Sequence, residues 1–338
     1  MAKENKSSRV KKREGVFCRC FLMRFFRFFD FSLEKSKKQS IIKADKDKTA
    51  KAGKEGRMQN DSDALRPEDY AEPRCLLCDE PYGAPPSIRP VPQQRIIEKM
   101  NDYMSRRDYA GAEKHLLYWL EEAKLGGDGR GELMLRNELV GHYRKTGERK
   151  KAFESANEAL RLLCELSMDG TVSAGTTYTN VATAYNAFGK NGDALALFEK
   201  AKTAYESSGK ASPELLGGLY NNMALTLVAL KRFPEAHALY DKAMEKMACV
   251  PGGVLEQAIT CLNRANAVED EKGLEAGEKE ITALLDRAWE LLNEESAPRD
   301  DYYAFVCEKC APTFSYYGYF LAAKELKERS EKIYHEGT

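Results

Sequence analysis

The chain has 338 residues, and its 53 basic and 53 acidic side chains leave no net charge overall. It contains no run of 18 uncharged apolar residues, so the sequence predicts no transmembrane helix. Its nine cysteines are an odd number scattered along the chain. This pattern favours a reducing compartment over a disulfide framework.

The first 57 residues differ in charge from the rest of the chain. Residues 1–57 hold 18 basic and 7 acidic side chains, a net charge of +11, whereas the remainder carries −11. Within this arm, residues 17–32 read VFCRCFLMRFFRFFDF, and a Lys-rich polar tract follows that is predicted to be disordered. The arm is interpreted as an interfacial membrane anchor, a ligand of its own acidic body, or a poorly ordered extension. No nucleic-acid recognition motif and no secretory cleavage site accompany it.

A linker over residues 58–92 separates this arm from the rest of the chain. It contains Cys75-Leu-Leu-Cys78 and a proline-rich run. A second CxxC pair, Cys307 and Cys310, lies near the other end of the chain, and four thiolates could hold zinc. An extended stack of repeats would hold the two pairs tens of ångströms apart, so we expect Cys307 and Cys310 to pack in the core. Zinc or thiol-redox chemistry at the first pair stays a minor alternative.

Residues 93–337 contain six copies of one pattern with a period of about 42 residues. The small residue that opens the second helix of each copy recurs at steps of 40, 42, 42, 45 and 42. These positions are Ala112, Ala152, Ala194, Ala236, Ile281 and Ala323. A fixed period of this length predicts a solenoid, in which each unit buries its apolar face against its neighbours.

Each copy is predicted to form two amphipathic helices. Apolar or small residues recur at three- and four-residue steps on both sides of a polar break. Ala201 and Ala243 fall where two helix backbones must cross closely. Pro312 lies inside the first helix of the last copy, where we expect a kink or an early end.

Residues 92–337 resemble the tetratricopeptide repeat family, in the longer variant that kinesin light chains use. The aromatic, small and alanine positions match well in the second to fourth copies. The resemblance implies an all-α fold, an α-solenoid of about six antiparallel helix pairs in a right-handed superhelix. It also implies that the first helix of each pair lines a concave groove for a peptide or protein segment.

An asparagine recurs on these first helices at Asn180, Asn222 and Asn263, at steps of 42 and 41. In resembling proteins such an asparagine often contacts a peptide backbone, because a carboxamide offers both a donor and an acceptor. The alternative is that these residues only cap or orient neighbouring helices. The candidate peptide-binding residues are Asn137, Asn180, Thr183, Asn221, Asn222, Asn263, Asn266 and Lys309.

The sequence offers no pattern that indicates catalysis. It has no phosphate-binding loop of the form GxxxxGK[ST], its four histidines are scattered, and its carboxylates fall on solvated helix faces. His142 and His237 are read as ordinary surface or packing residues. We therefore predict a cytoplasmic, non-enzymatic adaptor or scaffold without a cofactor, which binds protein or peptide and no nucleic acid. The alternatives are a membrane-recruited or autoinhibited regulator that uses the basic arm, and a zinc or thiol module at Cys75 and Cys78.

Overall fold

The computed structural model describes residues 88–336, which form twelve α-helices and no strand. The first helix of each pair is even-numbered: α2 (Gln93–Ser105), α4 (Gly129–Thr146), α6 (Val172–Ala187), α8 (Pro213–Ala229), α10 (Val254–Lys272) and α12 (Asp301–Tyr316). The second is odd-numbered: α3 (Tyr109–Leu125), α5 (Arg149–Glu165), α7 (Asn191–Ser208), α9 (Phe233–Ala248), α11 (Leu274–Asn293) and α13 (Phe320–Glu336). The predicted all-α solenoid of six helix pairs is confirmed for this part of the chain.

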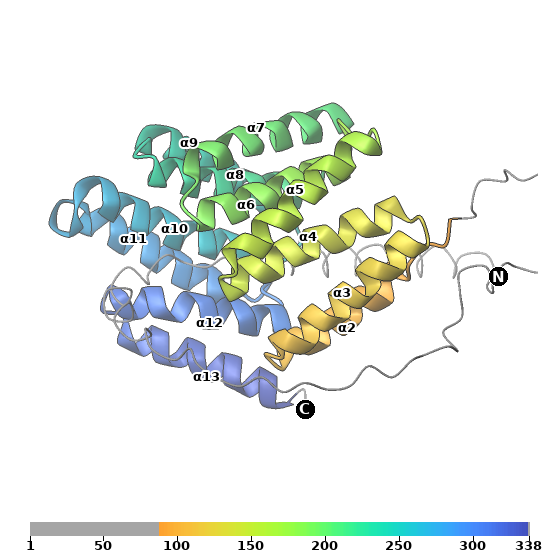
Figure 1. The fold of residues 1–338 in the computed structure, drawn as a ribbon. Coiled ribbons are helices and arrows are strands. Elements are labelled where there is room, and N and C mark those ends of the chain that lie inside the picture. The colour runs from red at the N-terminus through yellow and green to blue at the C-terminus, as the bar shows by residue number, and fades with distance from the viewer. Residues whose placement is uncertain (1–87, 337–338) are drawn as a thin grey trace, which may run out of the picture. The chain divides into compact units, whose positions relative to one another are not determined.

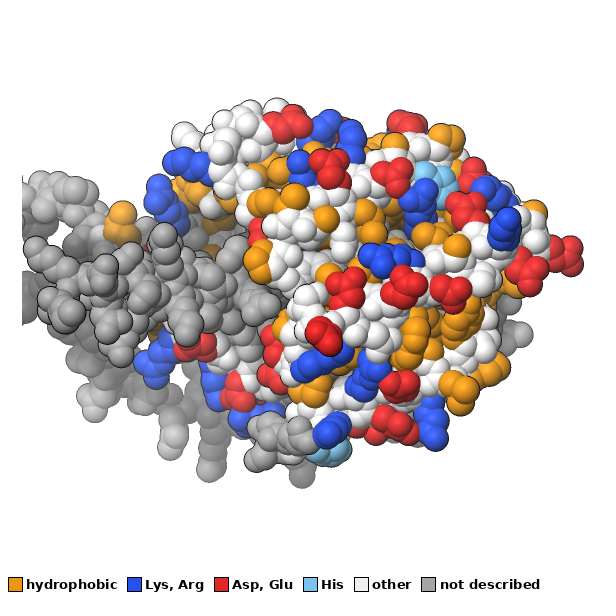
Figure 2. Space-filling view, turned by 180° about the vertical axis from the view of Figure 1, so that it is seen from behind, with side chains coloured by type: hydrophobic (Ala, Val, Ile, Leu, Met, Phe, Trp, Pro, Cys, Tyr) orange, Lys and Arg blue, Asp and Glu red, His pale blue; other side chains and the backbone are white. Residues whose placement is uncertain are grey.

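The helices form an inner and an outer layer. From α4 to α12, each even-numbered helix packs against the next even-numbered helix, and each odd-numbered helix packs on its own partner (Figure 1). We call the even-numbered helices the inner layer and the odd-numbered helices the outer layer. Figure 2 shows basic and acidic side chains interspersed over one face, with hydrophobic side chains between them.

Small side chains let the two helices of a pair approach each other. Ala194 and Ala201 in α7 are fully buried, as are their counterparts Ala236 and Ala243 in α9. The large side chain of Phe198 fills the space between the two alanines of α7 and is also fully buried. This alternation of small and large residues produces the packing that the repeat period predicted.

The first and last units contact each other, which differs from the sequence-based expectation that the ends lie far apart. Arg107, in the turn after α2, donates to Glu308 in α12 with an N–O distance of 2.9 Å. Figure 1 shows the turn between α2 and α3 next to the end of α12. Each repeat is rotated slightly relative to the one before, and over six repeats the accumulated rotation returns the chain to its starting side.

Two further expectations concern the last unit. A kink or an early end was expected at Pro312, and the early end is wrong, because α12 continues to Tyr316. Phe314, two residues after this proline, is fully buried and packs edge-on against Trp289 of α11, which anchors the final turn. The expected core burial of Cys307 and Cys310 is confirmed, and burial raises the pKa of the Cys307 thiol to about 11.

Other expectations lie outside the described residues, namely those for the arm (1–57), for most of the linker, and for Cys75 and Cys78. Within residues 88–336, no group of three or more His, Cys, Asp or Glu side chains could hold a metal ion. No helix described in this region is long and apolar enough to cross a membrane.

Two buried tyrosines in the outer layer are expected to respond oppositely to loss of the hydroxyl. The Tyr240 hydroxyl is fully buried without a hydrogen-bond partner, whereas the Tyr205 hydroxyl lies 3.1 Å from Thr176 Oγ1. We expect Tyr240→Phe to raise the free energy of unfolding by about 1 kcal/mol, because it removes an unsatisfied buried group. Tyr205→Phe should lower it by about 1 kcal/mol. Chemical denaturation of both variants tests this, and equal signs would contradict it.

Candidate functional site

One position of the inner layer recurs in five consecutive units. We call it the inner row: Glu138, Asn180, Asn222, Asn263 and Lys309. In α8, the next two residues, Met223 and Ala224, are buried in the clusters that join α8 to α7 and α9. Because consecutive helical residues are about 100° apart, Asn222 lies toward the neighbouring inner helices rather than toward the outer layer.

Two inner-row asparagines are hydrogen-bonded to the preceding inner helix. Asn180 donates to Asn137 Oδ1 at 3.3 Å, and Asn263 donates to Asn221 Oδ1 at 3.1 Å. In each case the acceptor residue directly precedes the inner-row position of the previous unit. Asn137 in turn donates to Thr177 Oγ1 at 2.9 Å. These amide bridges hold successive units together, so Asn180 and Asn263 have a structural role.

Asn222 lacks such a bridge. By the same register, the residue opposite it in α6 is Thr179, whose hydroxyl donates to the Gly175 carbonyl at 2.8 Å and makes no hydrogen bond with Asn222. Asn222 is 3% exposed, and both its Nδ2 and its Oδ1 lack a hydrogen-bond partner. A buried carboxamide without partners costs about 1–3 kcal/mol per group. Of the three asparagines in the inner row, Asn222 is the one with both amide atoms unbonded, whereas Asn263 lacks a partner only at Oδ1.

The other candidate residues have varied surroundings. Thr183 donates to the Thr179 carbonyl at 2.7 Å, and Asn266 accepts from the Tyr317 hydroxyl at 3.0 Å. Lys309 Nζ lies 5.9 Å from the centre of the Phe305 ring. Thr183 and Asn266 occupy the helical position three residues after the inner row, so they belong to the same face.

Glu256 is a residue of this face that the sequence analysis did not select. It lies seven residues before Asn263, which is two helical turns and therefore the same side of α10, and it is buried. The seven-residue spacing from Asn263 is the sequence pattern that would have placed Glu256 on this face. The inner face thus combines carboxamides and hydroxyls with buried carboxylates at Glu138 and Glu256.

His142, on α4, is a buried titratable group in the inner layer. It is 1% exposed and packs edge-on against Tyr143, and burial lowers the pKa of its imidazole. The unfolded chain therefore binds the proton more readily than the folded protein. We expect stability to be full above about pH 6.5 and to fall as the pH drops below that value, by at most about 1.4 kcal/mol per pH unit. Melting temperatures from pH 7.5 to 5.5 test this, and His142→Gln should show a smaller decline.

Comparison with known proteins identifies the repeats. Residues 173–248, which span α6 to α9, match the tetratricopeptide repeat family. No curated protein matches the chain. Among solved structures, BtubC (BKLC) from P. vanneervenii is 18% identical with a TM-score of 0.44, and the match covers 72% of this chain and 91% of that one.

Two further solved structures are similar at comparable identity. A provisionally named kinesin light chain from Podosopora anserina, with nearly identical TPR-like repeats, is 17% identical, with a TM-score of 0.42 and coverage of 60% and 95%. The TPR2AB domain of yeast Sti1, in a complex with pHSP90, is 18% identical, with a TM-score of 0.27 and coverage of 58% and 97%. These structural similarities are too distant to add to the assignment. The family match confirms the resemblance predicted from the sequence: this chain contains tetratricopeptide repeats, identified over residues 173–248.

Proposed function

We propose that this protein is a non-catalytic adaptor or scaffold that binds a peptide or protein segment on the inner face of its repeats. The observation that carries the proposal is the unused carboxamide of Asn222, which is buried beside two amide bridges. A carboxamide can hold the N–H and C=O of an extended main chain together. The tetratricopeptide repeat fold is typical of protein-interaction scaffolds, which supports the same assignment.

The burial of Asn222 has a kinetic consequence. Because the side chain is only 3% exposed, a peptide reaches it only if the inner face opens locally. We therefore expect association to be slower than the roughly 10⁵–10⁷ M⁻¹s⁻¹ that is usual for preformed surfaces. The recognition is directed at main-chain atoms, so it makes little demand on the side chains of the partner.

A peptide selected from a random library against the full chain tests this role. We expect Asn222→Ala to weaken binding of the selected peptide about tenfold, through loss of two hydrogen bonds to its main chain. Asn157→Ala, an exposed asparagine on the outer helix α5, is the matched control and should have no effect.

N-methylation of the peptide at each residue in turn supplies the second half of the test. At one position, methylation should weaken binding to the native protein but not to Asn222→Ala, because both changes remove the same hydrogen bond. If the two losses simply add at every position, Asn222 does not hold the peptide main chain.

The charged arm offers a second candidate role, supported by its net charge of +11 against −11 for the rest of the chain. If residues 1–57 compete for the inner face, their deletion or added salt should raise the affinity for the selected peptide. Equal affinities with and without the arm would remove the autoinhibition hypothesis.

A further inference from the structure

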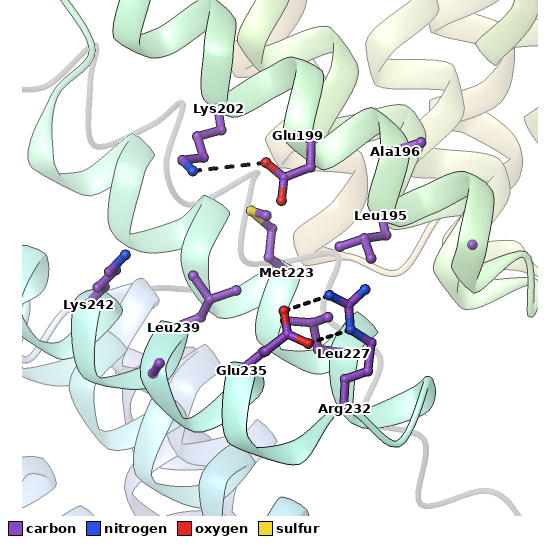
Figure 3. A pocket seen from close by; sticks show the side chains of 12 residues that line it. Leu195, Ala196, Glu199, Lys202, Met223, Leu227, Arg232, Glu235, Leu239 and Lys242 are labelled. Carbon is purple, nitrogen blue, oxygen red and sulfur yellow. Dashed lines mark hydrogen bonds and ion pairs between the residues drawn. The ribbon is translucent and has the colours of Figure 1, made fainter.

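A groove on the outer layer is distinct from the inner face. It lies between α7 and α9, with α8 as its floor, is open to solvent and has a volume of about 620 Å³ (Figure 3). Leu195, Met223, Leu227 and Leu239 supply an apolar lining. The lining residues of α7 run from Gly192 to Lys202, about 15 Å along the helix axis.

The equivalent space one unit earlier is occupied by aromatic rings of this chain. Phe153, which corresponds to Leu195, packs edge-on against Tyr185 and Phe188 at ring-centre distances of 5.0 and 5.5 Å. Lys190 Nζ lies 5.0 Å from the centre of the Phe153 ring. One unit later, Leu195 and Leu227 replace Phe153 and Tyr185 at the same 42-residue spacing. The third ring, Phe188, corresponds to Leu230, so no aromatic ring of the described residues lines the groove between α7 and α9.

The equivalent position one unit later is also occupied. His237, which corresponds to Leu195, contacts Glu271 of α10 with an N–O distance of 3.0 Å. Lys231 and Asp270 approach to 3.7 Å beside it. A polar contact therefore spans this position, as rings do at the earlier one. The groove between α7 and α9 has leucines in place of these rings and polar side chains.

The charged rim of the groove favours a negative ligand. Arg232, which corresponds to the Lys190 that lies over Phe153, holds Glu235 through two hydrogen bonds of 2.6 Å. At the opposite end, Lys202 lies 4.0 Å from Glu199, and Lys242 makes no ion pair with any residue of the described range. The groove therefore presents apolar walls with surplus positive charge at one end.

We propose that the groove between α7 and α9 binds an aromatic side chain of a partner protein that has an acidic residue beside it. The partner ring takes the place that Phe153 and Tyr185 fill one unit earlier, and the guanidinium of Arg232 lies beside it as Lys190 lies over Phe153. The neighbouring carboxylate pairs with Lys242 at the rim. The groove lies on the outer layer and the inner row on the inner layer, so the two proposed sites are tested separately.

The probe for this site is the peptide acetyl-Asp-Phe-Asp-amide, titrated into the full chain with labelled leucine and methionine methyl groups. We expect shifts at the methyls of Leu195, Met223, Leu227 and Leu239, with a Kd in the millimolar range because so few atoms make contact. Replacing Phe by Ala in the peptide should abolish the shifts. Replacing both Asp by Lys should weaken binding several-fold, and Lys242→Ala should reduce that difference.

A filled groove provides the decisive comparison. Leu195→Phe combined with Leu227→Tyr restores two of the three rings of the preceding unit and should weaken binding about tenfold or more. Leu274→Phe, which adds a ring at an exposed site on α11, is the matched control and should leave binding unchanged. Melting curves verify that both variants fold. Shifts at other methyls, no binding of the Phe peptide, or equal binding to the filled variant would each overturn the proposal.

Discussion

Replacing Phe198 by Ala is expected to lower the free energy of unfolding by about 3–5 kcal/mol, because it leaves a cavity in a packed core. The Phe198 side chain of α7 is fully buried and packs in the same apolar cluster as Leu219 and Met223 of α8. Each repeat is stabilised mainly by its neighbours, so a cavity in this unit also weakens its coupling to both sides. Guanidinium unfolding followed by circular dichroism measures the change.

The matched control for this change is Phe320→Ala at the start of α13. That side chain is 68% exposed, so its removal should change stability by no more than about 0.5 kcal/mol. A loss below about 1 kcal/mol in Phe198→Ala would contradict the packing described for α7. Unfolding in two separated steps would show that the cavity uncouples the units on its two sides.

Asn263→Ala and Asn222→Ala are expected to change stability in opposite directions, although the two residues occupy the same position of the repeat. Asn263→Ala removes the donor to Asn221 Oδ1 and leaves that buried oxygen without a partner, a loss of about 1–3 kcal/mol. Asn222→Ala removes a carboxamide that has no partner and should be neutral or stabilising by about 1 kcal/mol. Denaturant titration of the two single variants measures both effects.

This pair of variants also tests the proposed site. A polar side chain that lowers the stability of the free protein is a candidate ligand-binding group, because functional sites commonly reduce stability. If Asn222→Ala destabilises the protein as strongly as Asn263→Ala, Asn222 has an intramolecular partner, and the case for peptide binding by this residue is lost. Asn180→Ala, which removes the bond to Asn137, should destabilise the protein less than Asn263→Ala, because Asn137 and Asn180 are only half-buried.

Much of the architecture could be predicted from the period of the sequence. The 42-residue spacing, together with small residues such as Ala194 and Ala236, indicated helix pairs. The structure confirms the helix pairs, and it buries both alanines. Local rules are sufficient here because each unit is defined by its own amphipathic pattern and its contacts with neighbouring units. The asparagine positions of the inner row were likewise visible as a repeat.

The state of each asparagine depends on the tertiary structure. Asn180, Asn222 and Asn263 are alike in sequence, yet two of them form bridges and one does not. The difference lies in what the preceding helix presents: a carboxamide oxygen at Asn137 or Asn221, but at 179 a shorter threonine side chain that makes no hydrogen bond with Asn222. Such a contact joins residues about 42 positions apart, and no local pattern reveals which acceptor it meets.

Contacts between distant units also explain the closeness of the first and last units and the open groove, which the sequence did not predict. The contact between Arg107 and Glu308 arises from small rotations that accumulate over six units, and the helical pattern of one unit does not specify their sum. The groove between α7 and α9 is open because Leu195 and Leu227 stand where Phe153 and Tyr185 stand one unit earlier. Periodicity in the sequence determined which helices form and which faces they bury, because those depend on local hydrophobic spacing. The tertiary structure alone decided which inner-row asparagine stays unbonded and which groove stays open. Both outcomes depend on contacts between side chains that come from different repeat units.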